Sequence, residues 1–228
     1  MQFSHKQSTV NVAEDCSADK NGLFLDTENV SERKKELRTL FRERRKSLSA
    51  DDKRCFSEKL CKNILSLSEF KQADAVLSFY PLENETDIRA VNEETLKNGK
   101  ILAFPRCVKG TGEMNFFSVK SFDELEKGSF SIYEPREGCP IFVPSVGKKI
   151  ICLVPAMAYD GYGFRIGYGG GFYDRYLSRL GKNSSEKERS IFSVGVVYHP
   201  FLTDTLPHDE FDIAVDKVVT DLSVLDGE

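Results

Sequence analysis

The chain has 228 residues, 40% hydrophobic and 30% charged, which is the balance of a globular protein with one well-buried core. Its formal net charge of -4 argues against a protein whose main role is sequence-independent nucleic-acid binding, because that role requires a net basic surface, and it leaves a local basic patch open. We therefore expect no nucleic-acid partner.

The N-terminal segment and the cysteines indicate a compartment. Residues 1–30 are polar and aperiodic, with neither the apolar core of a signal peptide nor the Arg-rich, acid-poor character of a transit peptide. No segment approaches the roughly 18 consecutive apolar residues of a membrane helix. The six cysteines form no Cys-x-x-Cys pair and are interpreted as reduced thiols. We expect a cytoplasmic monomer with no membrane partner and a flexible polar tail over residues 1–30.

Two amphipathic helices are predicted to open the domain at residues 31–228. The segment Ser31–Leu48 places apolar residues on one stripe, and Ser31 is a plausible N-cap. Ser49 and Asp52 have the spacing of a capping box. They predict a second helix with apolar residues at helical spacing up to Leu67.

The following elements alternate between strands and helices. A strand over 74–80, a helix over 87–98 that Gly99 ends, and a strand over 100–105 form a strand-helix-strand unit, which predicts parallel pairing. Further strands are expected at 115–119, 130–135, 149–160, 191–199 and within 213–225. The continuous apolar run that opens 149–160 is typical of a central strand. We expect a single α/β domain with a mixed, mostly parallel sheet and helices on both faces.

A glycine-rich loop, "RIGYGGGFYDRYL" at Arg165–Leu177, lies between the central strand and a helix that Gly181 is expected to cap. Backbone N–H groups in such a loop can converge on an anion, helped by the positive end of the following helix. The run lacks the Lys-Ser/Thr of a Walker A loop, and Phe172 breaks the dinucleotide fingerprint. The loop favours a phosphate site, and a tight turn with close helix–sheet packing is the alternative.

Charged residues extend this hypothesis. Asp174, in the first turn of the helix, either complements the helix dipole or holds Mg²⁺ with a second carboxylate, for which Asp216 is a candidate. Lys34 and Arg38 begin a basic stripe that could close over phosphates. The stripe continues through Arg42 and Arg45, for which a solvated face is the alternative.

Several segments together resemble the 5-formyltetrahydrofolate cyclo-ligase family, over the chain from about Glu32 to near its end. They are "KKELR" (34–38), "FYPLENETD" (79–87), "FPR" (104–106), "VPAMAYDGYGFRIGYGGGFYDRYL" (154–177) and "DIAVDKVVTD" (212–221). The resemblance implies that ATP and Mg²⁺ are used to convert 5-formyltetrahydrofolate to 5,10-methenyltetrahydrofolate, with release of ADP and phosphate.

The resemblance also implies roles for individual residues. Lys34, Arg38 and Arg165 would act on the ATP phosphates as catalytic cations, and Asp174 and Asp216 would hold Mg²⁺. ATP would contact Lys34, Arg38, Arg165, Ile166, Gly167, Tyr168, Gly169, Gly170, Gly171, Phe172 and Tyr173. The folate would contact Tyr80, Glu85, Tyr168, Gly169, Gly170, Gly171 and Phe172.

Two assignments have alternatives in the sequence. Glu83 competes with Glu85, because the residues around Glu85 depart from the family pattern. Near the C-terminus, Phe211 stands where histidine is common in the family. The pair His208 and Asp209 therefore offers a competing register for the assignment of Asp216.

Two other functions stay open at this point. One is an ATP-dependent phosphotransferase that acts on another small metabolite. The other is a protein that binds reduced folate or nucleotide without turnover.

Overall fold

The computed structural model describes residues 27–108, 110–128, 132–145, 147–180 and 191–227. Its α-helices are α1 (Thr27–Lys46), α2 (Ala50–Ser66), α3 (Ser68–Gln72), α4 (Arg89–Lys97) and α5 (Phe172–Arg179). Its strands are β1 (Ala75–Leu77), β2 (Ile101–Cys107), β3 (Met114–Val119), β4 (Leu125–Lys127), β5 (Tyr133–Pro135), β6 (Ile150–Pro155), β7 (Ala158–Asp160), β8 (Arg165–Ile166), β9 (Ile191–Val196), β10 (Leu202–Thr203), β11 (Lys217–Val219) and β12 (Val224–Asp226).

A seven-stranded sheet in the order β12-β11-β9-β6-β1-β2-β3 forms the centre of the domain. The strands from β11 to β2 run parallel, whereas β12 and β3 pair antiparallel at the two edges. β1 is entirely buried, and β6 is buried except for Pro155, as expected for strands covered on both faces. The carboxyl ends of the parallel strands therefore meet at one edge of the sheet.

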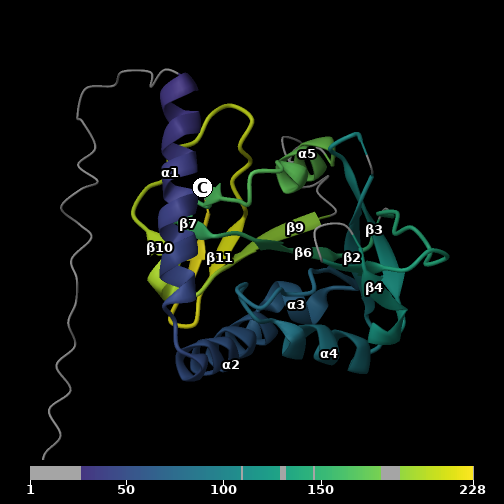
Figure 1. Cartoon of the computed structure of the whole chain (residues 1–228). Helices are drawn as coiled ribbons and strands as arrows, with labels where there is room; N and C mark the ends of the chain where they lie inside the picture. Colours follow the sequence, from purple (N-terminus) through teal and green to yellow (C-terminus); the bar gives the residue numbers. More distant parts are fainter. Residues whose placement is uncertain (1–26, 109, 129–131, 146, 181–190, 228) are drawn as a thin grey trace, which may run out of the picture.

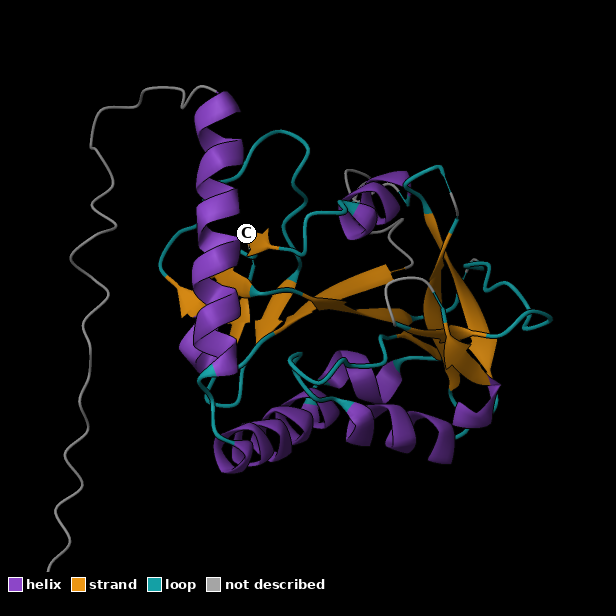
Figure 2. Cartoon of the chain, viewed as in Figure 1, coloured by secondary structure: helices purple, strands orange, loops and turns teal. Residues whose placement is uncertain are grey.

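Helices cover both faces of this sheet, which confirms the predicted fold class. Helices α2, α3 and α4 lie on one face and α5 lies on the other (Figures 1 and 2). Helix α1 runs along one end of the molecule, where the ring of Phe41 contacts that of Phe201 with centroids 6.3 Å apart. Each layer buries its apolar side chains in one continuous core.

Most predicted elements are present, but several bounds differ. The predicted N-cap Ser31 lies inside α1, whose described part begins at Thr27 and buries Val30. The first strand ends at Leu77, three residues before the predicted end. Beyond it, the Ser78 hydroxyl donates to the Asn92 side chain, which in turn donates to the carbonyl oxygen of Phe79. The last segment forms β11 and the antiparallel edge β12.

Three predictions lie wholly or partly outside the described residues. One is the strand at 130–135, whose described part contains β5. Another is the proposed C-cap Gly181, and within the described part Leu180 caps α5. The predicted tail falls mostly on residues 1–26, and residues 27–30 belong to α1.

The five described cysteines are free thiols. None of the described helices combines the length and apolarity needed to cross a membrane.

The N-cap predicted at the start of α2 is present and gives a stability test, although the Asp52 carboxylate accepts a hydrogen bond from the Ser49 hydroxyl and not from the Ser49 backbone N–H that a full capping box uses. The Ser49 hydroxyl accepts a hydrogen bond from the backbone N–H of Asp52, at 3.1 Å. Ser49→Ala should lower the free energy of unfolding by about 1 kcal/mol, because it removes this acceptor from the helix N-terminus. Urea unfolding measures the change. Ser66→Ala, which removes a hydroxyl at the other end of α2, is the matched control, and an equal loss in both variants would contradict the capping role.

Candidate functional site

A cavity of about 480 Å³ opens at the carboxyl ends of β1, β2 and β6. Phe79 and Tyr80 follow β1, Pro105 and Cys107 belong to β2, and Pro155 ends β6. The glycine-rich loop and the first turn of α5 form the opposite side of this cavity. This is the position where open α/β sheets bind ligands, and its largely apolar lining suits a flat, partly apolar molecule.

The glycine-rich loop adopts backbone conformations that require glycine. Gly169 and Gly171 have φ of +101° and +62°, a region that residues with a side chain rarely occupy. Gly171 is also the N-cap of α5, and it has no side chain to satisfy the first N–H groups of that helix. Arg38 of α1 donates from Nε to the carbonyl oxygen of Gly167 at 3.0 Å. The structure therefore brings the predicted basic residue Arg38 against the predicted anion-binding loop.

A buried cation connects this loop to the C-terminal segment. Arg165, 7% exposed, donates to the carbonyl oxygen of Ile213 at 2.7 Å and to Asp174 Oδ1 at 2.5 Å. Asp174 Oδ1 also accepts the backbone N–H of Ile213 at 3.1 Å. Arg165 and Asp174, both predicted as site residues, therefore form one hydrogen-bonded unit. Because this unit includes both backbone groups of Ile213, it fixes residues 209–213 beside α5.

A second buried cation, Lys34 of α1, contacts the same C-terminal segment. Its ammonium group lies 2.8 Å from Asp209 Oδ2 and also contacts Asp212 Oδ2. Burial lowers the pKa of Lys34, but the hydrogen bonds to the two carboxylates outweigh burial and raise it. The hydrogen bond from Lys34 lowers the pKa of Asp209 in turn. Lys34 is therefore a fixed positive charge at the site.

The structure does not bring Asp216 to Asp174. The Asp216 carboxylate accepts hydrogen bonds from the backbone N–H and the hydroxyl of Ser193, at 2.7 and 2.6 Å, and Asp216 precedes the first residue of β11. Asp212 lies on the same side as Asp174, because both residues line a cavity of about 700 Å³ beside α5. Asp216 does not line this cavity. The spacing signal was present in the sequence, because Asp212 opens the same Asp-x-x-x-Asp stretch that Asp216 closes.

The donor set formed by Asp174 and Asp212 fits a hard divalent cation. Within the described residues, Asp174 Oδ2 and Asp212 Oδ1 receive no hydrogen bond, so each carboxylate has one oxygen available. No group of three or more potential ligands occurs in the described part of the chain. Mg²⁺ usually takes only one or two carboxylates and completes its shell with water and phosphate oxygens.

The predicted folate residues Tyr80 and Glu85 both line the apolar cavity. The ring of Tyr80 packs against the rings of Phe104, Phe122 and Tyr133 with centroids 5.1 to 6.3 Å apart. Glu85 Oε2 accepts the backbone N–H of Leu82 at 2.9 Å, which fixes the carboxylate at the cavity wall.

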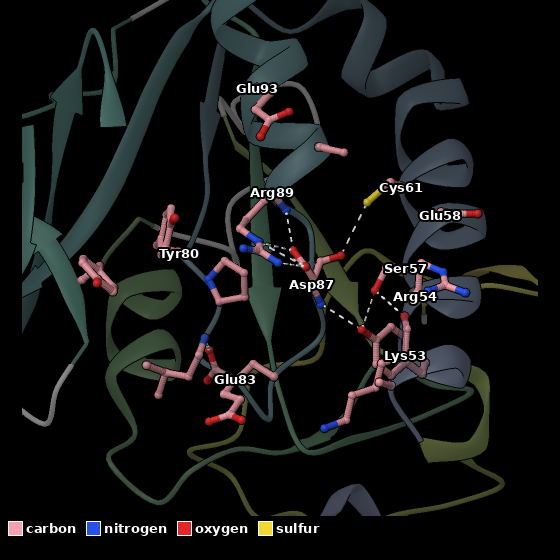
Figure 3. Close-up of a pocket in the computed structure, with 17 residues that line it drawn as sticks. Lys53, Arg54, Ser57, Glu58, Cys61, Tyr80, Glu83, Asp87, Arg89 and Glu93 are labelled. Atoms are coloured by element: carbon pink, nitrogen blue, oxygen red, sulfur yellow. Dashed lines mark hydrogen bonds and ion pairs between the residues drawn. The ribbon is translucent and has the colours of Figure 1, made fainter. Parts of the chain in front are cut away.

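The competing residue Glu83 is exposed and lines a different, larger cavity of about 930 Å³ between α2, α4 and the loop that joins β1 to α4 (Figure 3). Glu85 lines both cavities. The geometry therefore favours Glu85 over Glu83 as a residue that can reach a ligand in the apolar cavity.

The other two basic residues of the predicted stripe, Arg42 and Arg45, have different environments. Arg42 is exposed, as a solvated face predicts. Arg45, in contrast, is 4% exposed and donates to the carbonyl oxygens of Asn84, Ala156 and Met157. Its guanidinium also lies over the ring of Phe201, 4.9 Å from the centroid. Sequence reasoning did not predict that Arg45 joins α1 to the loop that carries Glu85.

Comparison with known proteins gives consistent results. The model of the 5-formyltetrahydrofolate cyclo-ligase family matches residues 30–221. The chain is 26% identical to 5-formyltetrahydrofolate cyclo-ligases from Mus musculus and Escherichia coli K12, over 83% and 79% of this chain and 94% and 96% of theirs. The solved structure of 5,10-methenyltetrahydrofolate synthetase from Aquifex aeolicus is 35% identical with a TM-score of 0.68, and the likeness covers 85% of this chain and 92% of that one.

The contact between Lys34 and Asp209 predicts a titration change. Lys34→Met should raise the pKa of Asp209 toward its ordinary value of 3.8, because the hydrogen bond that lowers it is lost. A carboxyl pKa that is lowered in the folded state stabilises the fold above the ordinary pKa, and this stability is lost as the pH falls through the lowered pKa. The difference in unfolding free energy between wild type and variant should therefore shrink below about pH 4.

Carboxyl NMR titration measures the pKa of Asp209 directly, and unfolding at several pH values measures the stability difference. Lys35→Met, which changes an exposed neighbour on α1, is the matched control. An unchanged Asp209 pKa in Lys34→Met would show that the ion pair does not form in solution.

Proposed function

The chain belongs to the 5-formyltetrahydrofolate cyclo-ligase family and is a ligase, and we propose that it uses ATP and Mg²⁺ to convert 5-formyltetrahydrofolate to 5,10-methenyltetrahydrofolate, releasing ADP and phosphate. The observation that carries the proposal is the apolar cavity whose wall is the glycine-rich loop. A folate and a polyphosphate placed there would share one boundary. This is the arrangement that phosphoryl transfer between them requires.

Two adjoining cavities support this placement. The apolar cavity and the one beside α5 share Met114, Gly171 and Asp174 in their linings. The reduced pteridine would occupy the apolar cavity between Tyr80 and the loop, and the phosphates would lie along the loop toward Asp174. The reacting atoms of the two substrates would then meet at the loop.

The proposed reaction needs no nucleophile from the protein. The formyl oxygen attacks the γ-phosphorus, the phosphoanhydride bond breaks, and ADP leaves. N10 then attacks the activated formyl carbon and loses its proton. The carbon–oxygen bond breaks as the ring closes, so the formyl oxygen and that proton leave with the phosphate. Both nucleophiles belong to the folate, so the protein acts by aligning the substrates and neutralising phosphate charge.

The basic residues have different proposed roles. Arg38 is half-buried at the loop and, with Lys34 and the loop N–H groups, would bind the phosphates and stabilise their developing charge. Arg165 already donates to Asp174 and Ile213, so we propose that it mainly holds the metal-binding carboxylate in place. When bound, Mg²⁺ would supply further charge neutralisation for the phosphates.

We propose that Asp174 and Asp212, and not Asp216, hold the Mg²⁺. Both carboxylates line the cavity beside α5, and each has one oxygen without a hydrogen-bond donor among the described residues. Asp216 lines neither this cavity nor the apolar one, and its carboxylate accepts two hydrogen bonds from Ser193.

On the folate side, Tyr80 would pack against the pteridine ring, and Glu85 would accept hydrogen bonds from its N–H groups. Glu83 would stay outside the folate site.

We also propose a cytoplasmic location, and the free thiols of the five described cysteines support a reducing compartment. We propose that the protein acts as a monomer.

The direct test is to incubate the purified protein with 5-formyltetrahydrofolate, ATP and Mg²⁺ and to record formation of methenyltetrahydrofolate by its near-ultraviolet absorbance. The signal should require all three components, because the formyl oxygen is activated only by phosphoryl transfer. Omission of each component in turn is the control. A folded protein that binds ATP but forms no methenyl product would overturn the proposed reaction and favour a phosphotransferase with another substrate.

Carboxylate variants test the metal assignment. Asp212→Asn and Asp174→Asn should each raise the Mg²⁺ concentration needed for half-maximal turnover by roughly ten-fold or more, because a neutral amide binds a hard cation weakly. Asp216→Asn is the matched control and should leave the Mg²⁺ requirement within about two-fold, even if it lowers stability by weakening the Ser193 contacts. The reverse ranking of Asp212 and Asp216 in a Mg²⁺ titration would contradict our assignment.

A further inference from the structure

Arg175 of α5 connects the glycine-rich loop to a turn at the edge of the sheet. Its Nε donates to the carbonyl oxygen of Gly112 at 2.8 Å, although the two residues lie 63 positions apart. Its Nη2 contacts the same oxygen and also the carbonyl oxygen of Gly170. Gly112 lies in the turn that joins β2 to β3, beside α5 (Figure 1). One guanidinium therefore bridges two backbone carbonyls from different parts of the fold.

This guanidinium is fixed in place although Arg175 is exposed. It lies over the ring of Phe172, with its central carbon 5.4 Å from the ring centroid. It also lies against Gly171, where a Cβ would come within 2.8 Å of Nη1. Arginine suits this role because its planar guanidinium presents five N–H donors in a rigid fork, whereas lysine has one compact ammonium group. The position of Arg175 thus determines where the loop backbone lies at Gly170.

The contact with Gly170 also determines which way the next N–H group points. The peptide bond is trans and planar, so the carbonyl of Gly170 and the N–H of Gly171 point in opposite directions. Because the carbonyl points at Arg175, this N–H points away from it. The N–H has no acceptor among the described residues, and Gly171 lines both the apolar cavity and the cavity beside α5. It is therefore available to an anion at the start of α5.

The turn between β2 and β3 holds the guanidinium from the other side. The N–H of Val108 donates to the carbonyl oxygen of Glu113 at 2.8 Å, which closes the turn. Gly112 has a φ of +71°, and a Cβ there would lie 3.1 Å from Arg175 Nη2. Gly110 has a similar φ of +78°, but a Cβ there would meet nothing within 4 Å. The two glycines therefore share a backbone conformation and differ in their contact with Arg175.

We propose that Arg175 is a positioning residue for the nucleotide: by bridging Gly112 and Gly170, it directs the N–H of Gly171 at the phosphates. The turn between β2 and β3 would thereby contribute to nucleotide affinity from outside the site. This inference rests on the proposed function, because it takes the anion to be the phosphates of ATP. Arg175 also lines the cavity beside α5, so a direct contact between its charge and a phosphate is the alternative that the experiment must separate.

Titration calorimetry of the full-length protein with a non-hydrolysable ATP analogue and Mg²⁺ tests the proposal. Arg175→Met should raise the dissociation constant of the analogue by roughly ten-fold, because the N–H of Gly171 no longer donates to a charged phosphate. Arg175→Lys should raise it as well, because an ammonium group does not reproduce the fork that bridges the two carbonyls. The factor for Arg175→Met should be the same at low and high ionic strength, because the lost donor is an uncharged N–H group.

Gly112→Ala tests the turn without changing the glycine-rich loop or α5. The added Cβ would displace Arg175 Nη2, so the analogue should bind several-fold more weakly. Gly110→Ala is the matched control, because it introduces a side chain at a positive φ in the same turn but makes no contact with Arg175. It should leave the dissociation constant within about two-fold of the wild-type value. Urea unfolding measures the backbone strain in both variants.

The Arg175 variants should fold, because a second arginine attaches α5 to β3. Arg179, one turn further along the helix, donates to the carbonyl oxygen of Met114 and to Asn115 Oδ1, both at 3.1 Å. These contacts keep α5 beside the sheet when Arg175 is replaced. A change in nucleotide affinity without a large change in the free energy of unfolding would therefore arise at the loop.

The other outcomes would overturn the inference or the proposed function separately. Wild-type affinity in Arg175→Met would overturn the inference. Wild-type affinity in Arg175→Lys, or a loss in Arg175→Met that shrinks at high ionic strength, would also overturn it, because Arg175 would then act as a phosphate-binding charge. Equal effects of Gly110→Ala and Gly112→Ala would overturn the role of the turn. A wild type that binds the analogue but forms no methenyl product would overturn the proposed reaction alone, and one that does not bind the analogue would overturn both.

Discussion

The buried guanidinium of Arg165 is the constraint on which the site depends. A charge that is 93% removed from solvent is costly unless it is paired, and Arg165 meets this requirement with Asp174 and the carbonyl oxygen of Ile213. Asp174 lies at the start of α5, and Ile213 lies in the segment before β11. If α5 and the C-terminal segment separated, the buried guanidinium would lose its hydrogen-bond partners. The cost of that loss therefore holds the two segments together.

This pairing also explains why Asp212 lies where the proposed second metal-binding carboxylate is needed. Both backbone groups of Ile213 are held, its carbonyl by Arg165 and its N–H by Asp174, so the preceding residue is placed beside α5. Lys34 then contacts Asp212 and Asp209 from α1. Arg165 and Lys34 thus hold the carboxylates of Asp174 and Asp212 beside the same cavity, although the two negative charges repel each other. A divalent cation is the ligand that would relieve this repulsion most directly.

The sequence was most informative where the signal is local. The N-cap Ser49 and the turn at the glycine-rich loop depend on residues within a few positions, and both occur where they were predicted. The choice between Asp212 and Asp216 depends on contacts with Lys34, more than 170 positions away, so spacing alone could not decide it. The inward position of Arg45 likewise depends on carbonyl oxygens that only the folded chain brings to α1.

Helix α1 unites these separate contacts. Lys34, Arg38 and Arg45 are spaced by four and seven residues, which places them along one side of a helix. Lys34 reaches the segment with Asp212, Arg38 reaches the glycine-rich loop, and Arg45 reaches the loop with Glu85. A helix is stiff over this length, so the separations among the three segments are set by its rise of about 1.5 Å per residue. The proposed metal, nucleotide and folate sites are thus aligned by one basic face, which explains how the protein could bring two substrates into position for a reaction that needs no nucleophile from the protein.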